Sequence, residues 1–157
     1  MQHRMKTHQL DRHQIDMLLS SRQVGTIATI NKDGTPYCVP VHFVYADGKI
    51  YIHGLPAGQK INNLIANPNV CLSVYNMDCL LLDENGVPCD TNTKYQSAVI
   101  QGTAKIVSDI ERKAEILGYI VAKYTPNLKD VPLAKAMVKG TAVTEIEISE
   151  ITGKYWE

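Results

Sequence analysis

The sequence has no excess of either charge, because 16 lysine and arginine residues balance 16 aspartate and glutamate residues in a chain of 157. Proteins that bind nucleic acids or anionic membranes usually rely on a positive field, which a neutral chain lacks. We therefore expect neither nucleic acid nor a membrane surface among its partners. No apolar run approaches the roughly 20 residues that cross a bilayer, so no transmembrane helix is predicted.

Cysteine is scarce and widely spaced. The four cysteines, at positions 38, 71, 79 and 89, form no Cys-x-x-Cys pair, so the sequence predicts neither a structural zinc site nor a redox dithiol. The segment from Met1 to Asp11 is polar and lacks the apolar stretch of a secretory signal. These features favour a cytoplasmic protein with free thiols.

Motifs for nucleophilic catalysis are also missing. The chain has no Gly-x-Ser-x-Gly elbow and no evident pair of acid and base carboxylates, so we assign no catalytic residue. His42, His53 and Cys38 fall on neighbouring predicted strands, but they lack a carboxylate and the spacing of metal ligands. We predict no metal site. The dinucleotide-binding glycine fingerprint is absent as well, so a nicotinamide could bind only transiently.

The first half of the chain predicts a helix followed by an antiparallel meander. Ile15, Leu18 and Leu19 share one helical face between about residues 10 and 22, and Asp11 is a candidate N-cap. Three β-rich segments follow, joined by two Asp-Gly turns, which are typical of hairpins. The predicted strands are 24–30, 37–45 and 49–53.

The second half mixes helices with further strands. We expect helices at 59–66, 110–124 and 133–139, strands at 70–75, 95–107 and 141–151, and an irregular excursion over 77–93. Ser108 and Glu111 form a predicted capping box for the second of these helices. Its predicted apolar face consists of Ile110, Ala114, Leu117 and Val121.

Together these elements predict a single, mainly β domain over residues 1–157. About six antiparallel strands with short flanking helices favour a small barrel, because closing the sheet removes its exposed edges.

Gly58, Gln59 and Lys60 begin the helix that follows the third strand. Free N–H groups at a helix N-terminus attract anions, and a lysine there adds a positive charge. This arrangement is suited to a phosphate. A glycine turn with a surface lysine would look the same in the sequence.

The order of the motifs resembles the FMN-binding split barrels related to pyridoxamine 5'-phosphate oxidase, and within them the nitroimidazole-resistance (Nim) branch. The motifs that carry the resemblance extend over most of the chain: Asp33-Gly-Thr-Pro36, Val39-Pro-Val-His42, Asp47-Gly-Lys-Ile-Tyr-Ile-His53, Gly58-Gln-Lys60, Asn67-Pro-Asn-Val70, Tyr95-Gln-Ser-Ala-Val-Ile-Gln-Gly-Thr-Ala104, Lys139-Gly-Thr-Ala-Val143 and Glu150-Ile-Thr-Gly-Lys154. The resemblance implies a six-stranded Greek-key split barrel. It also implies a homodimer with two FMN sites at the subunit interface.

The resemblance assigns cofactor contacts to particular residues. Lys60 would pair with the FMN phosphate, and backbone groups of the strand from Tyr37 to His42 would meet the edge of the isoalloxazine ring. A partner residue near Tyr155 or Trp156 would cover the flavin. The complete set of implied cofactor-binding residues is Tyr37, Val39, Pro40, Val41, His42, His53, Gly54, Gly58, Gln59, Lys60 and Ser97.

Two departures from the family pattern argue against vitamin B6 oxidation. Gln59-Lys60 replaces the Arg-Lys pair at the phosphate turn, and Tyr37 stands where those oxidases carry a phosphate-binding arginine. The resemblance instead implies an FMN-dependent oxidoreductase for small aromatic or nitro-aromatic acceptors, with a reduced nicotinamide as donor. His42 and His53 are candidates to gain charge and stabilise a reduced flavin.

Alternatives remain for the cofactor and for the activity. FAD could replace FMN. Split barrels also bind haem, for which His53 would be the axial ligand. A third interpretation is a non-catalytic flavin-binding module.

Overall fold

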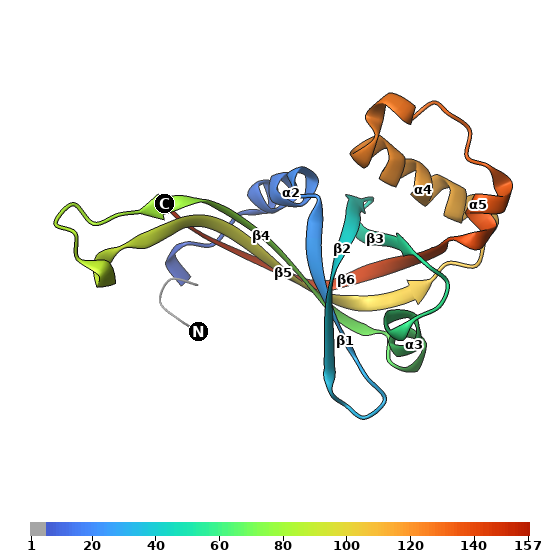
Figure 1. Ribbon diagram of the computed structural model, residues 1–157, viewed down its shortest axis with the longest axis horizontal. Helices are drawn as coiled ribbons and strands as arrows, with labels where there is room; N and C mark the ends of the chain where they lie inside the picture. Colours follow the sequence, from blue (N-terminus) through green and yellow to red (C-terminus); the bar gives the residue numbers. More distant parts are fainter. Residues whose placement is uncertain (1–5) are drawn as a thin grey trace.

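Six antiparallel strands form a closed barrel in the computed structural model, which describes residues 6–157 (Figure 1). The segment from Met1 to Asp11, for which the sequence predicts no secretory signal, lies partly outside the described residues. The strand order is β1-β2-β3-β6-β5-β4, in which β4 returns beside β1, as in a Greek key. This confirms the predicted split-barrel fold class. The strands are β1 Val24–Ile30, β2 Pro36–Ala46, β3 Lys49–Gly54, β4 Asn69–Leu81, β5 Asn92–Ile106 and β6 Ala142–Trp156.

Short helices cover the barrel. They are α2 Arg12–Ser21, α3 Gln59–Ala66, α4 Ile110–Tyr124 and α5 Lys135–Gly140, with 3-10 turns η1 Pro88–Asp90 and η2 Pro126–Leu128. Asp11 caps α2, as predicted, by accepting a hydrogen bond from the Gln14 N–H at 2.8 Å. Among residues 6–157, no helix has the length and apolar character needed to span a membrane.

The two predicted Asp-Gly hairpins are present. Asp47 and Gly48 have φ angles of 51° and 73°, so the turn between β2 and β3 has two successive residues in the left-handed region. Gly34 also has a positive φ, of 85°, in the turn between β1 and β2. These turns fix the register of the first three strands.

The predicted range of α4, 110–124, is correct, but its predicted cap and buried face are each wrong by one residue. Asp109 caps the helix, in place of Ser108, by accepting a hydrogen bond from the Arg112 N–H at 2.7 Å. Ile110 is exposed, and the buried residues are Lys113, Ile116 and Ile120. Lys113 occupies a core-facing position because its Nζ donates to Lys139 O at 3.1 Å, which ties α4 to α5.

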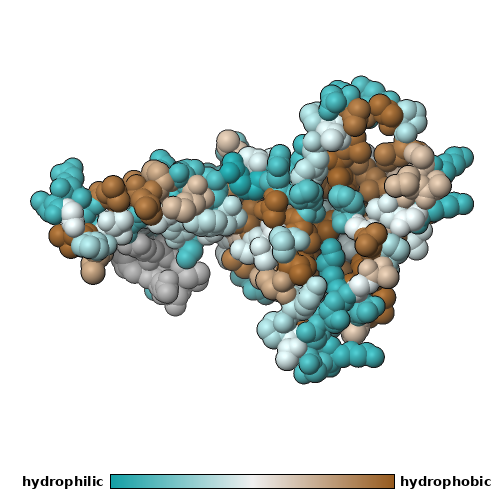
Figure 2. All heavy atoms as spheres, in the orientation of Figure 1, coloured by the Kyte–Doolittle hydropathy of each residue, from teal (hydrophilic) through white to brown (hydrophobic). Residues whose placement is uncertain are grey.

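The predicted irregular excursion over 77–93 is correct in its middle and wrong at both ends. Residues 82–91 lie outside the strands and contain only the 3-10 turn η1, whereas the residues on either side extend β4 and β5. These ends of the two strands form an arm that leaves the barrel at the left of Figure 1. A register shift occurs between Met77 and Cys79. The arm carries exposed apolar residues, seen as brown patches in Figure 2, among them Met77, Leu80, Leu82 and Val87.

Two apolar clusters form the core. The larger fills the barrel and includes Ile15, Leu18 and Leu19 of α2, which pack against inward-facing strand residues such as Phe43 and Ile52. The smaller lies outside the barrel, where Ile116 and Ile120 of α4 cover Val44, Tyr51 and Val143. Each strand therefore faces the barrel core with alternate residues, while β2, β3 and β6 also bury part of their outer face beneath α4.

β3 is much shorter than the two strands beside it. It has 6 residues, whereas β2 has 11 and β6 has 15. It pairs only with Phe43–Ala46 of β2 and with Ala142–Ile146 of β6. As a result, β2 leaves an edge open beyond one end of β3, and β6 leaves an edge open beyond the other.

Gly102 provides a test of the close approach between β5 and β6. A Cβ atom there would lie 2.3 Å from Glu147 O, beside a register shift between Gln101 and Gly102. We expect Gly102→Ala to lower the free energy of unfolding by about 1–3 kcal/mol, measured by urea denaturation. The control Gly118→Ala adds a methyl group to open space in α4 and should raise it by up to about 1 kcal/mol. Equal stability of Gly102→Ala and the unmodified protein would contradict this packing.

Candidate functional site

The open edge of β2 is the first component of the candidate site. Residues 37–42 pair with β1 on one side, while β3 begins to pair only at Phe43. Within the described chain, the second edge of this segment therefore has no strand partner. Exposed backbone N–H and C=O groups of such an edge can bond a planar ligand that presents complementary polar atoms.

Side chains of this segment alternate between the two faces of the sheet. Val41 is buried in the barrel core and Val39 packs against it, so these two predicted contacts can reach a ligand on the outer face only through their backbone. Tyr37 lies on the same face of the strand as Val39 and Val41, and it is partly buried. Pro40 and His42 lie on the outer face and are exposed.

His42 and His53 come together on the outer face. Phe43 pairs with Ile52 across β2 and β3, so one step along this register brings His42 opposite His53. The Nδ1 atom of His53 is buried and has no hydrogen-bond partner among residues 6–157. A buried polar atom without a partner is costly, so it marks a place where a ligand could supply one.

Lys60 lies beside this histidine, although it comes from α3. A Cβ atom added to Gly54 would lie 4.0 Å from Lys60 Nζ, so the absence of a side chain at Gly54 leaves the amine accessible from β3. Burial lowers the pKa of Lys60, and no carboxylate of the described residues raises it again. Gly58 precedes the helix with a φ of 128°, a conformation that favours glycine.

Gln59 does not direct its side chain toward Lys60. Its Nε2 atom donates to Asn31 Oδ1 at 3.0 Å and to Asn63 Oδ1 at 2.8 Å. The buried Asn63 in turn donates to Thr29 Oγ1 at 3.0 Å and to Asn31 Oδ1 at 2.8 Å. This network fixes the start of α3 against β1 and occupies the side-chain N–H groups of Gln59, so they are not available to a ligand. Sequence reasoning missed Asn63, whose one signal is its place on the buried face of α3.

Positive charge in the site resides on Lys60 rather than on His53. Burial lowers the pKa of His53, and the neighbouring His42 and Lys60 lower it further. Since its usual value is about 6.5, His53 is neutral at pH 7. The expectation that His53 gains charge near neutral pH is therefore not supported, and its ring is available instead as a neutral hydrogen-bonding group.

Tyr124 is a further component that the sequence did not reveal. Its ring stacks on His42 with a centroid distance of 4.8 Å and an interplanar angle of 23°. Its hydroxyl bonds the backbone of Phe43. Tyr124, the last residue of α4, thus covers one side of the site through its contact with His42.

Ser97 lies elsewhere in the same chain. It pairs with Lys154 of β6, whereas His53 pairs with Val143 of that strand. Eleven residues separate these two positions, which corresponds to roughly 35 Å along a strand. Tyr155 and Trp156 follow Lys154, so they too lie at the far end from His53.

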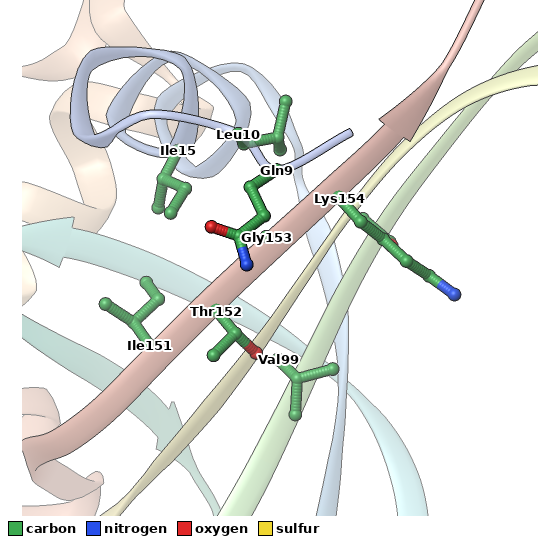
Figure 3. A pocket seen from close by; sticks show the side chains of 9 residues that line it. Gln9, Leu10, Ile15, Val99, Ile151, Thr152, Gly153 and Lys154 are labelled. Carbon is green, nitrogen blue, oxygen red and sulfur yellow. The ribbon is translucent and has the colours of Figure 1, made fainter. Parts of the chain in front are cut away.

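A cavity of about 270 Å³ opens beside Ser97 (Figure 3). Gln9 and the apolar side chains of Leu10 and Ile15 bound it on one side, while Thr152 and Lys154 of β6 bound it on the other. The structure thus groups His42, His53, Gly54 and Lys60 at one opening of the barrel and Ser97 at the other.

Metal ligands do not cluster within the described part of the chain. No group of three or more histidine, cysteine, aspartate or glutamate residues in 6–157 could hold a metal ion. The four cysteines are free thiols.

The titration of His53 tests this electrostatic description. Its ring-proton NMR resonances should shift with a midpoint below pH 6.5, because burial disfavours protonation and the neighbouring His42 and Lys60 lower the pKa of His53 further. Lys60→Met should raise this midpoint, while Lys105→Met, which removes an exposed lysine of β5, should leave it unchanged. The folded protein resists a proton that the unfolded chain accepts, so the contribution of His53 to stability is lost as the pH falls through its folded pKa. A midpoint above 6.5 would contradict the burial of this ring.

Comparison with known proteins places this arrangement in context. The chain matches the family model described as pyridoxamine 5'-phosphate oxidase over residues 11–155. A search of curated proteins finds no match. A candidate 5-nitroimidazole antibiotic resistance protein from Bacteroides thetaiotaomicron is 25% identical, with a TM-score of 0.80, covering 93% of this chain and 85% of that one.

Two further solved structures share the fold. The flavocytochrome Anf3 from Azotobacter vinelandii is 24% identical with a TM-score of 0.82, covering 94% of this chain and 68% of that one. A FAD and haem binding protein from Mycobacterium smegmatis is 20% identical with a TM-score of 0.86, covering 96% and 74%. The match of the family model along almost the whole chain shows that this protein belongs to the pyridoxamine 5'-phosphate oxidase family.

Proposed function

We propose that this protein binds a flavin nucleotide at the open edge of β2 and acts as a flavin-dependent oxidoreductase. The observation that carries the proposal is the buried Nδ1 of His53, which has no partner among residues 6–157 and lies close to His42 and Lys60. The site combines a polar atom that solvent does not reach, a strand edge without a partner and the amine of Lys60. Together they suit a ligand that has a polar ring system at one end and an anion at the other.

Lys60 and the N-terminus of α3 would hold the phosphate. The helix has no side-chain cap at Gly58, so its first N–H groups are available to an anion. The lysine adds a full positive charge that no described carboxylate offsets. Asn63 and Gln59 contribute indirectly, because their network keeps the helix start in place.

When bound, a flavin supplies hydride or electron transfer. The backbone of residues 37–42 would orient the ring, and neutral His53 would offer a hydrogen bond without adding charge. Tyr124 and His42 would exclude water from one side. The remaining binding residues of the proposed site are Gly54, Gly58, Gln59 and Lys60.

We further propose FMN as the cofactor and a small aromatic or nitro-aromatic compound as the acceptor, with a reduced nicotinamide as donor. Support comes from the likeness to the candidate 5-nitroimidazole resistance protein. Departures at Tyr37 and Gln59 argue against pyridoxamine phosphate as substrate. FAD is the alternative flavin, because several neighbours of the same fold are described as FAD-binding proteins.

A homodimer would reconcile the position of Ser97 with a role at the flavin. One chain holds Ser97 and His53 at opposite openings of the barrel. A twofold pair of chains could place the Ser97 end of one protomer, including Tyr155 and Trp156, over the His53 end of the other. Ser97 would then complete the site of the second protomer.

Haem is the second candidate ligand. Two neighbours of the same fold are described as a flavocytochrome and as a FAD and haem binding protein. His53 is the histidine available as an axial ligand, since its Nδ1 has no partner among the described residues. A third possibility is a flavin-binding module without turnover.

The absorption spectrum of the purified full-length protein separates these candidates. Two flavin bands after reconstitution with FMN or FAD support the proposal, whereas a Soret band supports haem. Bleaching of the bound flavin by NADH or NADPH without oxygen would identify an enzyme, and persistent colour would favour the non-catalytic module. A protein that takes up neither FMN nor FAD contradicts the proposal.

Replacing Lys60 tests the phosphate contact. Lys60→Ala should raise the Kd for FMN by a factor equivalent to about 1–3 kcal/mol, because a charge-assisted contact with the phosphate is lost. Fluorescence titration measures the change. Riboflavin lacks the phosphate, so its Kd should not change. The exposed Lys105→Ala serves as the matched control. Equal loss of riboflavin and FMN binding would assign Lys60 a structural role instead.

A further inference from the structure

The hydroxyl of Tyr124 bonds the backbone where β2 leaves β1. It accepts a hydrogen bond from the Phe43 N–H at 2.9 Å and lies 2.7 Å from Phe43 O and 2.6 Å from Gln23 O. A phenol has one proton to donate, so it serves one of the two carbonyl groups at a time. Burial raises the pKa of Tyr124 above its usual value of 10, so the hydroxyl remains a donor at neutral pH.

This hydroxyl takes the place of a strand partner. Val24 is the first residue of β1 and pairs with His42. Phe43 is one residue further along β2, beyond the end of the β1 pairing, where its N–H and C=O groups need another partner. The side chain of Tyr124 supplies it on the edge of β2 that faces β1, where it also bonds Gln23 O.

The ring of Tyr124 restrains His42 at the same time. The two rings stack at 4.8 Å with an angle of 23°, although His42 is otherwise exposed on the outer face. Stacking favours one orientation of the imidazole over the others that an exposed side chain could adopt.

The end of α4 is itself anchored independently of His42. Lys123 Nζ donates to Leu19 O at 3.0 Å and lies 4.1 Å from the centroid of the Phe43 ring. These contacts join α4 to α2 and to β2. Tyr124 is therefore presented to the strand from a fixed position.

We propose that Tyr124 is a positioning residue of the flavin site, which orients His42 with its ring and holds the β2 backbone with its hydroxyl. The proposal rests on the proposed flavin site. It adds that α4, which contributes no residue to the phosphate end, holds the β2 backbone at one end of the segment along which the flavin ring would lie.

Two substitutions separate the ring from the hydroxyl. Tyr124→Phe keeps the stacking but leaves the Phe43 N–H without its partner, and it should raise the Kd for FMN about threefold to tenfold. Tyr124→Leu also removes the stacking and should raise the Kd about tenfold to a hundredfold. Tyr119→Phe is the matched control from the same helix, because its hydroxyl bonds the exposed carboxylates of Glu115 and Asp47. Its Kd should stay within about twofold of the unmodified protein.

A second measurement, made without flavin, tests the action through His42. The ring-proton NMR resonances of His42 should move in Tyr124→Leu, because the neighbouring aromatic ring is lost, and they should stay in place in Tyr119→Phe. In a His42→Ala background, Tyr124→Leu and Tyr124→Phe should give the same Kd, because the ring then has nothing to orient.

The outcomes distinguish this proposal from the proposed function. An unmodified protein that binds no flavin overturns both. If it binds FMN and both Tyr124 variants bind equally well, the positioning role is overturned and the flavin site stands. Unmoved His42 resonances in Tyr124→Leu, or a difference between the two variants that persists in the His42→Ala background, would also overturn the role of the ring.

Discussion

The short length of β3 is the constraint on which the rest of the structure depends. With only 6 residues between strands of 11 and 15, β3 closes the barrel but cannot satisfy the full edges of its neighbours. Exposed strand edges attract unwanted pairing unless they are covered or used. The molecule covers part of the β6 edge with residues 8–10, where Leu10 N bonds Gly153 O and Tyr155 N bonds His8 O, both at 3.0 Å. The β2 edge remains available, and the polar side chains of the candidate site gather there.

Three helices pack against the barrel, and each makes a different kind of contact with it. α2 inserts Ile15, Leu18 and Leu19 into the barrel core, while α3 brings Lys60 toward the end of β3 through a network of asparagine and glutamine side chains. α4 packs on the outside and reaches the strand backbone with a tyrosine hydroxyl. α3 and α4 therefore fix parts of the rim that Lys60 and His53 line, whereas Ile15 of α2 bounds the cavity at the other opening, beside Ser97.

The sequence predicts the barrel well because its signals are local and strong. Asp47 and Gly48 adopt the conformations that the hairpin motif requires, and Asp11 caps its helix. The sequence does not indicate the arm, because both of its faces are largely exposed and the apolar alternation typical of a strand is absent. Nor does the apolar pattern indicate the buried face of α4, because Lys113 is buried there. The stacking of Tyr124 on His42 joins residues far apart in the chain, so no local pattern could predict it.

The arm formed by the ends of β4 and β5 has a consequence for the evolution of the protein. None of residues 77–95 belongs to either apolar core. Selection on the stability of the barrel therefore acts weakly on the length and composition of the arm, because segments outside a core tolerate insertion and deletion. We expect related chains to differ more in the reach of this arm than in any other element, and so to acquire new contacts there without disturbing the opening that His53 and Lys60 line.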